Sequence, residues 1–197
     1  MVRIREKPRL PAMNLPNFIT ILRVLLIPVF MLVYYSHFYG HHILSAGIFI
    51  IACLTDWLDG HAARVLKQTS RFGAFLDPVA DKLLIAISLV ILAASYTDAW
   101  YVIPASLIVA REVLVSALRE WMAEQQQRDA VAVGWVGKWK TTVQMIALGL
   151  LLATDPGGLI WLWLPGYVLI NVAAALALWS MSIYLHSAWP VLKNGMK

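Results

Sequence analysis

The sequence predicts an all-α fold, namely a polytopic membrane protein with six transmembrane helices. Two features of the composition support this class: 60% of the 197 residues are hydrophobic, and only 14% are charged. Several apolar runs also reach about 20 residues, which is the length that crosses a bilayer. This composition excludes a disordered chain. We expect one domain over residues 1–197, with a short basic N-terminal segment at 1–12.

Each expected helix is an apolar run that a polar or glycine-containing break brings to an end. The breaks are, in order, His41-His42, Lys67 to Arg71, Thr97-Asp98, Glu124 to Asp129, and Asp155-Pro156-Gly157-Gly158. The spans between them are expected at 16–39, 43–66, 73–96, 101–122, 137–154 and 160–186. Because the second break is short, the second and third helices are expected to be antiparallel neighbours.

The distribution of Lys and Arg predicts the orientation of these helices in the bilayer. The loops around residues 40, 98 and 156 contain no Lys or Arg, whereas the 16 basic residues gather at the opposite helix ends. Cytoplasmic loops carry the excess of positive charge, so both termini are expected to be cytoplasmic. This topology explains the net charge of +5, and we therefore expect no nucleic-acid partner. The same face would attract the anionic head groups of the lipid bilayer.

Four carboxylates form the most informative feature of the chain. Asp56 and Asp59 lie at the inner end of the second expected helix, and Asp77 and Asp81 lie at the inner start of the third. Each pair shares one helix face. An acid at the centre of a membrane helix costs about 2.5 to 3.5 kcal/mol, so a positive partner is required. Oxygen-only ligands favour one or two hard cations, Mg²⁺ or Mn²⁺.

A structural alternative exists for these acids. In that alternative they face a loop and are held by Arg64, Arg71 and Lys82, without a metal ion. Glycines at helical spacing and the placement of the acids across a hairpin favour the metal site. Gly60 and Gly73 leave room for a ligand close to the backbone, and they also permit close packing of helices.

The spacing Asp56-x2-Asp59-Gly60-x2-Ala63-Arg64-x8-Gly73-x3-Asp77-x3-Asp81 resembles the signature of the CDP-alcohol phosphotransferase family at every position. Further runs resemble the bacterial phosphatidylglycerophosphate synthases of that family, most closely those of the enterobacterial type. These runs are Asn14 to Thr20 with Arg23, Arg71 to Pro78, Ala110-Arg111-Glu112, and Gly137 to Thr141 with Gln144-Met145. The resemblance covers nearly the whole chain.

The resemblance implies a reaction in which CDP-diacylglycerol donates a phosphatidyl group and CMP leaves. The acceptor hydroxyl would attack the lipid-side phosphorus. Asp56, Asp59 and Asp77 would be metal ligands, and Asp81 would be the general base and a further ligand. The family also implies a homodimer. The resemblance also implies a multi-pass protein of the bacterial cytoplasmic (inner) membrane, with its active site facing the cytoplasm.

Several residues near the motif are expected to bind CDP-diacylglycerol. By resemblance, Gly60, Ala63 and Arg64 would line the cytidine pocket. Asn17 and Thr20 can reach the same nucleotide from the first helix, although capping of that helix explains them as well. Arg23 lies inside an apolar helix and needs a negative partner, which either the acidic cluster or the diphosphate supplies.

A second basic group suggests the acceptor. Arg111, Lys138 and Lys140, with a contribution from Arg119, are expected to grip a phosphate separate from the diphosphate. Such a phosphate belongs to sn-glycerol 3-phosphate, whose free 1-hydroxyl would be the nucleophile. The alternative is that these residues only anchor the topology. His37, His41 and His42 lie far from the acids and receive no role.

Two rival functions fit the same sequence features. The first is the same chemistry with inositol phosphate, serine or phosphatidylglycerol as the acceptor. The second is a divalent-cation transporter that uses the acidic cluster as its relay. The nearly charge-free outer halves of the helices count against the transporter, because a relay needs charged or broken helices along the full membrane depth. A purely structural protein gains nothing from four acids inside the membrane.

Overall fold

The computed structural model describes residues 15–66, 71–125 and 135–195, and all regular structure within these ranges is α-helical. The elements are α1 (Leu15–Tyr34), α2 (His41–Leu66), α3 (Arg71–Ser95), α4 (Ala99–Glu124), α5 (Trp135–Leu152) and α6 (Ile160–Gly195). Each helix overlaps one of the predicted spans. The all-α prediction is therefore confirmed for the described part of the chain.

Two helix ends differ from the prediction by more than two residues. α1 stops at Tyr34 rather than at residue 39, because the chain turns there through positive φ angles of 54° at His37 and 87° at Gly40. α6 continues to Gly195 rather than ending at residue 186. Its extension is held by packing, since Ala188 is buried in a small apolar cluster with Val115 and Met122 of α4. Tertiary contacts thus extend a helix beyond its apolar run.

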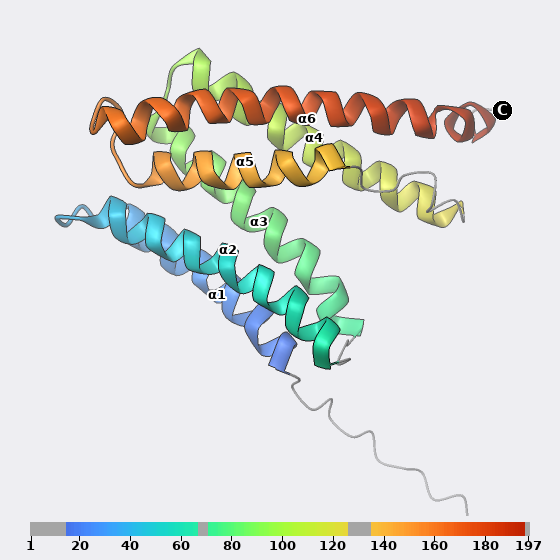
Figure 1. Cartoon of the computed structure of the whole chain (residues 1–197), viewed down its shortest axis with the longest axis horizontal. Helices are drawn as coiled ribbons and strands as arrows, with labels where there is room; N and C mark the ends of the chain where they lie inside the picture. Colours follow the sequence, from blue (N-terminus) through green and yellow to red (C-terminus); the bar gives the residue numbers. More distant parts are fainter. Residues whose placement is uncertain (1–14, 67–70, 126–134, 196–197) are drawn as a thin grey trace, which may run out of the picture.

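Hydrogen bonds between helices show how they run. Contacts between α1 and α3 join Thr20 to Asp77, Arg23 to Asp81, and Tyr34 to Ser95, so the two helices are parallel. Contacts between α4 and α6 join Trp100 to Asn171, Arg111 to Ser180, and Arg119 to Tyr184, so these helices are also parallel. α3 runs between the α1–α2 hairpin and the group of α4, α5 and α6 (Figure 1).

The starts of α1, α3 and α5 and the ends of α2, α4 and α6 consequently lie at one end of the bundle (Figure 1). We call this the motif end, because the last residues of α2 and the first of α3 carry the acidic motif. The opposite end contains the turn between α1 and α2 and the turn between α5 and α6.

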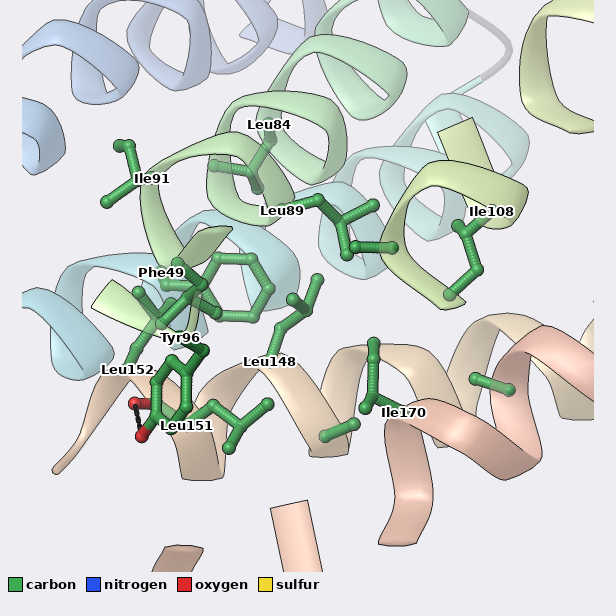
Figure 2. Close-up of a cluster of buried hydrophobic side chains, with 14 of the residues drawn as sticks. Phe49, Leu84, Leu89, Ile91, Tyr96, Ile108, Leu148, Leu151, Leu152 and Ile170 are labelled. Atoms are coloured by element: carbon green, nitrogen blue, oxygen red, sulfur yellow. Dashed lines mark hydrogen bonds between the residues drawn. The ribbon is translucent and has the colours of Figure 1, made fainter. Parts of the chain in front are cut away.

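The apolar core occupies the half of the bundle away from the motif end. Side chains from five helices meet there, including Phe49 of α2, Leu89 of α3, Ile108 of α4, Leu148 of α5 and Ile170 of α6 (Figure 2). The buried charged residues lie in the other half, and most buried polar residues lie there too: Thr20, Arg23, Arg111, Lys140, Gln144 and Ser180, whereas Ser45, Ser88 and Thr154 lie in the apolar half. The interior is therefore divided into an apolar half and a polar half.

Two of the described helices are long and apolar enough to cross a membrane, by length and composition. They are α4, over Ala99–Glu124, and α6, over Ile160–Lys193. Shorter apolar helices cover Phe18–Tyr34, His41–Thr55 and Trp139–Leu152. The presence of six spans and their orientation stay predictions.

Close packing of α5 on α6 leads to a stability prediction. A Cβ atom at Gly166 of α6 would lie 2.8 Å from Cγ and 2.9 Å from Cδ2 of Leu151, which is fully buried in α5. We expect Gly166→Ala to destabilise the fold by about 1–3 kcal/mol through overpacking. Thermal unfolding in detergent measures this effect as a lower Tm. Gly47→Ala is the matched control, because its Cβ would meet nothing within 4 Å. A Tm as high in Gly166→Ala as in this control would contradict the packing.

Candidate functional site

Two polar contacts join α1 to α3 at the motif end. Oγ1 of Thr20 donates a hydrogen bond to Oδ1 of Asp77 at 2.5 Å. Nη1 of Arg23 donates to Oδ1 of Asp81 at 2.7 Å and forms an ion pair with it. The two pairs match because Thr20 and Arg23 lie about one turn apart on α1, as Asp77 and Asp81 do on α3. The structure thus brings Thr20 and Arg23 of α1 next to Asp77 and Asp81 of α3, on two parallel helices.

Arg23 is the most deeply buried charge of this group, with a side chain that is 0% exposed. A buried guanidinium without an opposite charge is strongly destabilising, so the contact with Asp81 is a requirement of the fold. The Asp81 side chain keeps 35% of its surface exposed, so a ligand can still reach it. Arg23 is a compensating cation that the alternative with Arg64, Arg71 and Lys82 did not include.

Thr20 does not cap α1, so the capping interpretation is wrong for this residue. α1 begins at Leu15, and Thr20 lies inside the helix with a buried side chain. Its hydroxyl instead orients the Asp77 carboxylate. The side chain of Asn17 lies outside the described part of the structure.

The α2 half of the motif is known only from its backbone. Asp56, Asp59, Gly60, Ala63 and Arg64 lie in the last turns of α2, close in sequence to the start of α3. Their side chains are outside the described part, so the convergence of four carboxylates stays a prediction. Gly73 of α3 is buried.

The described acids of the motif could supply ligands to a metal ion. No group of three metal-binding side chains occurs among the described residues, which include only Asp77 and Asp81 of the four motif acids. These two acids offer oxygen atoms alone, from adjacent turns of one helix. Such donors suit a hard divalent cation and do not suit zinc or copper.

A second polar group joins α4, α5 and α6. Nη1 of Arg111 donates to Oε1 of Glu112 at 2.9 Å, and Nζ of Lys140 contacts the same oxygen. Nη2 of Arg111 donates to Oγ of Ser180 at 3.0 Å. Arg111 is 7% exposed and Lys140 is 3% exposed. Lysines that only anchor topology snorkel to the surface, so the anchor interpretation does not explain these two buried cations.

Glu112 is the residue of this group that the sequence analysis missed. It bridges Arg111 and Lys140, and it lies in an otherwise apolar stretch of α4. An acid beside an arginine within an apolar helix is itself a signal of function, because its insertion is costly. With Glu112 included, the two cations and one carboxylate keep one positive charge in excess, which suits an anionic ligand.

Arg119 and Lys138 are less closely tied to this group. Arg119 is exposed, and its Nη2 donates to the Tyr184 hydroxyl at 2.7 Å. Tyr184 also receives cation–π contacts from Arg119 at 5.2 Å and from Arg111 at 5.8 Å, so one ring lies beside both arginines. Lys138 lies in the first turn of α5, and its side chain is outside the described part.

An apolar groove of about 650 Å³ lies between α2 and α5. Its lining residues include Gly47, Ile50, Leu54, Met145, Gly149 and Leu150. The groove is partly open to the surface, and at Leu54 it comes to within two residues of Asp56. An apolar groove that ends close in sequence to the acidic motif suits the hydrocarbon part of a lipid.

Comparison with known proteins extends this description. The model of the CDP-alcohol phosphatidyltransferase family matches residues 13–183. A Pseudomonas fluorescens protein is 48% identical over 184 residues, covering 92% of this chain and 93% of that protein. A Salmonella typhimurium relative is 51% identical over 175 residues (89% and 94%), and one from Yersinia enterocolitica is 49% identical over 178 residues (90% and 96%). All three are named CDP-diacylglycerol–glycerol-3-phosphate 3-phosphatidyltransferase.

The Glu112 bridge leads to a prediction about stability. Glu112→Gln leaves two buried cations without their counter-charge, and we expect the fold to lose about 3 kcal/mol. This is the low end of the range for a broken buried pair, because the Glu112 side chain is 25% exposed. Thermal unfolding in detergent measures the loss, and Glu120→Gln, at an exposed position of α4, is the control. Equal Tm values for the two variants would show that Glu112 does not hold these cations.

Proposed function

The chain belongs to the CDP-alcohol phosphatidyltransferase family, and from this premise we propose that it transfers a phosphatidyl group from CDP-diacylglycerol to sn-glycerol 3-phosphate. The products would be phosphatidylglycerophosphate and CMP. The names and the near-complete coverage of the curated relatives support this choice. The single observation in the structure that supports it is the buried pair of cations, Arg111 and Lys140, which would bind the acceptor phosphate.

In the proposed reaction, the 1-hydroxyl oxygen of glycerol 3-phosphate attacks the lipid-side phosphorus of the donor. A new phosphorus–oxygen bond forms, the bond to the bridging oxygen breaks, and CMP leaves with the electron pair. The hydroxyl proton passes to the Asp81 carboxylate. Arg23 supports this role by position, because its contact at 2.7 Å holds the Asp81 carboxylate in place on α3.

The remaining motif acids would hold the metal. Asp56, Asp59 and Asp77, with Asp81, would bind one or two Mg²⁺ or Mn²⁺ ions. The hydrogen bond from Thr20 fixes one oxygen of Asp77 and leaves the orientation of that carboxylate defined. When bound, the metal would neutralise the charge that develops on the leaving CMP phosphate.

The donor would extend from the motif into the groove between α2 and α5. Gly60, Ala63, Arg64, Gly73 and Asn17 would surround its nucleotide and diphosphate. An acyl chain fits the groove, because the lining is apolar and the groove comes close to Asp56 in α2. This arrangement would bring the scissile bond next to Asp81 while the lipid tail stays in apolar surroundings.

The acceptor phosphate would bind to Arg111 and Lys140, with help from Lys138 and Arg119. A charged site of this kind favours a phosphorylated alcohol, whereas serine or phosphatidylglycerol does not need it. Inositol phosphate is the second candidate acceptor, since it carries the same phosphate group. Membership of a transferase family leaves the cation transporter without support.

We also propose the location and topology that the charge distribution supports. The described lysines and arginines of the site lie on the motif-end side of the apolar core, and the turns at the opposite end carry His37, Asp98 and Asp155. This asymmetry supports six spans with both termini and the active site on the cytoplasmic side of the inner membrane. A homodimer is the expected assembly in the bilayer.

An assay of the purified protein tests the proposed function. CDP-diacylglycerol is offered with glycerol 3-phosphate, inositol 1-phosphate, serine or phosphatidylglycerol, and lipid product and CMP are measured together. We expect one CMP per phosphatidylglycerophosphate with glycerol 3-phosphate and no comparable product with the other acceptors. Exhaustive EDTA treatment should abolish turnover, and Mg²⁺ or Mn²⁺ should restore it. Faster transfer to another acceptor would contradict the substrate, and full turnover in EDTA would contradict the metal.

A further inference from the structure

One buried amide in the polar half of the bundle forms no hydrogen bond with either of the two polar groups described above. The side chain of Gln144, on α5, is 1% exposed. Neither its Nε2 nor its Oε1 atom has a hydrogen-bond partner among the described residues. Buried amides in folded proteins are almost always paired, because removing them from water without a partner costs free energy. Gln144 therefore requires an explanation beyond packing.

Gln144 lies next to the buried cations, where the polar half of the bundle meets the apolar core. It follows Lys140 by about one helical turn and lies on the same face of α5. One further turn along, Leu148 points into the apolar core (Figure 2). α4 crosses the same boundary between apolar and polar surroundings, since Ile108 lies in the core and Arg111 follows in the next turn. The Gln144 amide thus lies between an apolar core and the group of Arg111, Glu112 and Lys140.

The polar atoms left without described partners at this boundary define a ligand. They are Nε of Arg111 and Nε2 of Gln144, which are donors, and Oε1 of Gln144, which is an acceptor. An ionised phosphate accepts hydrogen bonds and so satisfies the two donors only. The amide oxygen needs a donor, such as an alcohol hydroxyl. The complementary ligand therefore carries both a phosphate and a hydroxyl group close to it.

We propose that Gln144 recognises the hydroxyl of the acceptor that does not react, and that it is a specificity-determining residue. This inference rests on the proposed function. In sn-glycerol 3-phosphate the 1-hydroxyl is the nucleophile, so the 2-hydroxyl remains, on the carbon next to the phosphate-bearing carbon. With the phosphate on Arg111 and Lys140, the 2-hydroxyl donates to Oε1 of Gln144. A substrate that lacks this hydroxyl leaves the amide oxygen unpaired.

The test compares two acceptors that differ only in this hydroxyl. 3-Hydroxypropyl phosphate has the phosphate and the nucleophilic hydroxyl of glycerol 3-phosphate but lacks the 2-hydroxyl. The measured quantity is the ratio of kcat/KM for glycerol 3-phosphate to kcat/KM for this analogue. We expect a ratio of about ten or more in the wild-type protein, because a buried polar group rejects a substrate that cannot pair with it. In Gln144→Met the ratio should fall close to one.

Leu148→Met is the matched control, because it also introduces a methionine, at a buried position one turn further along the same face of α5. Its ratio should equal that of the wild-type protein. A purely structural role of Gln144 would instead lower the Tm of Gln144→Met and leave the ratio unchanged, which would overturn the inference. A wild-type ratio close to one would also overturn it, and this measurement needs no variant. Absence of transfer to glycerol 3-phosphate in the wild-type protein would contradict the proposed function itself.

Discussion

A charge inside an apolar helix bundle must be paired with an opposite charge, and two such pairs organise this molecule. Arg23, which is fully buried in α1, contacts Asp81 of α3. Lys140 of α5 contacts Glu112 of α4, which also pairs with Arg111. Breaking either pair would leave an uncompensated buried charge, so each pair fixes the relative position of the helices that carry it. The residues to which we assign a function therefore also stabilise the fold.

This arrangement separates the two parts of the proposed reaction. The α1–α3 pair lies at the acidic motif and orients the carboxylates that would meet the donor diphosphate. The group on α4, α5 and α6 is cationic and suits a second phosphate. In the proposed function the two sites need opposite charge, because one would bind its phosphates through metal ions and the other would bind its phosphate directly. Their separation onto different helices would keep the motif acids from neutralising the proposed acceptor-site cations.

Much of the fold and of the candidate site could be predicted from the sequence, because helix periodicity and the cost of buried charge are local properties. The six apolar runs, the motif and the need of Arg23 for a negative partner were all visible in the chain. The extension of α6 was not, since packing of Ala188 on α4 decides it. The bridging role of Glu112 and the burial of Gln144 depend on how α4 and α5 are rotated toward each other. The distance between these helices in the sequence gives no information on that rotation.

The central claim is that the donor and acceptor phosphates are held by different residues, and equilibrium binding tests it most directly. Binding of glycerol 3-phosphate and of CDP-diacylglycerol is measured separately for the wild-type protein, Lys140→Ala and the control Lys193→Ala, at the exposed end of α6. A charge-assisted hydrogen bond contributes about 1.5–3 kcal/mol, so Lys140→Ala should weaken glycerol 3-phosphate binding about tenfold or more. Its affinity for CDP-diacylglycerol should match that of the control. Unchanged binding of glycerol 3-phosphate, or an equal loss of both ligands, would contradict two separate phosphate sites.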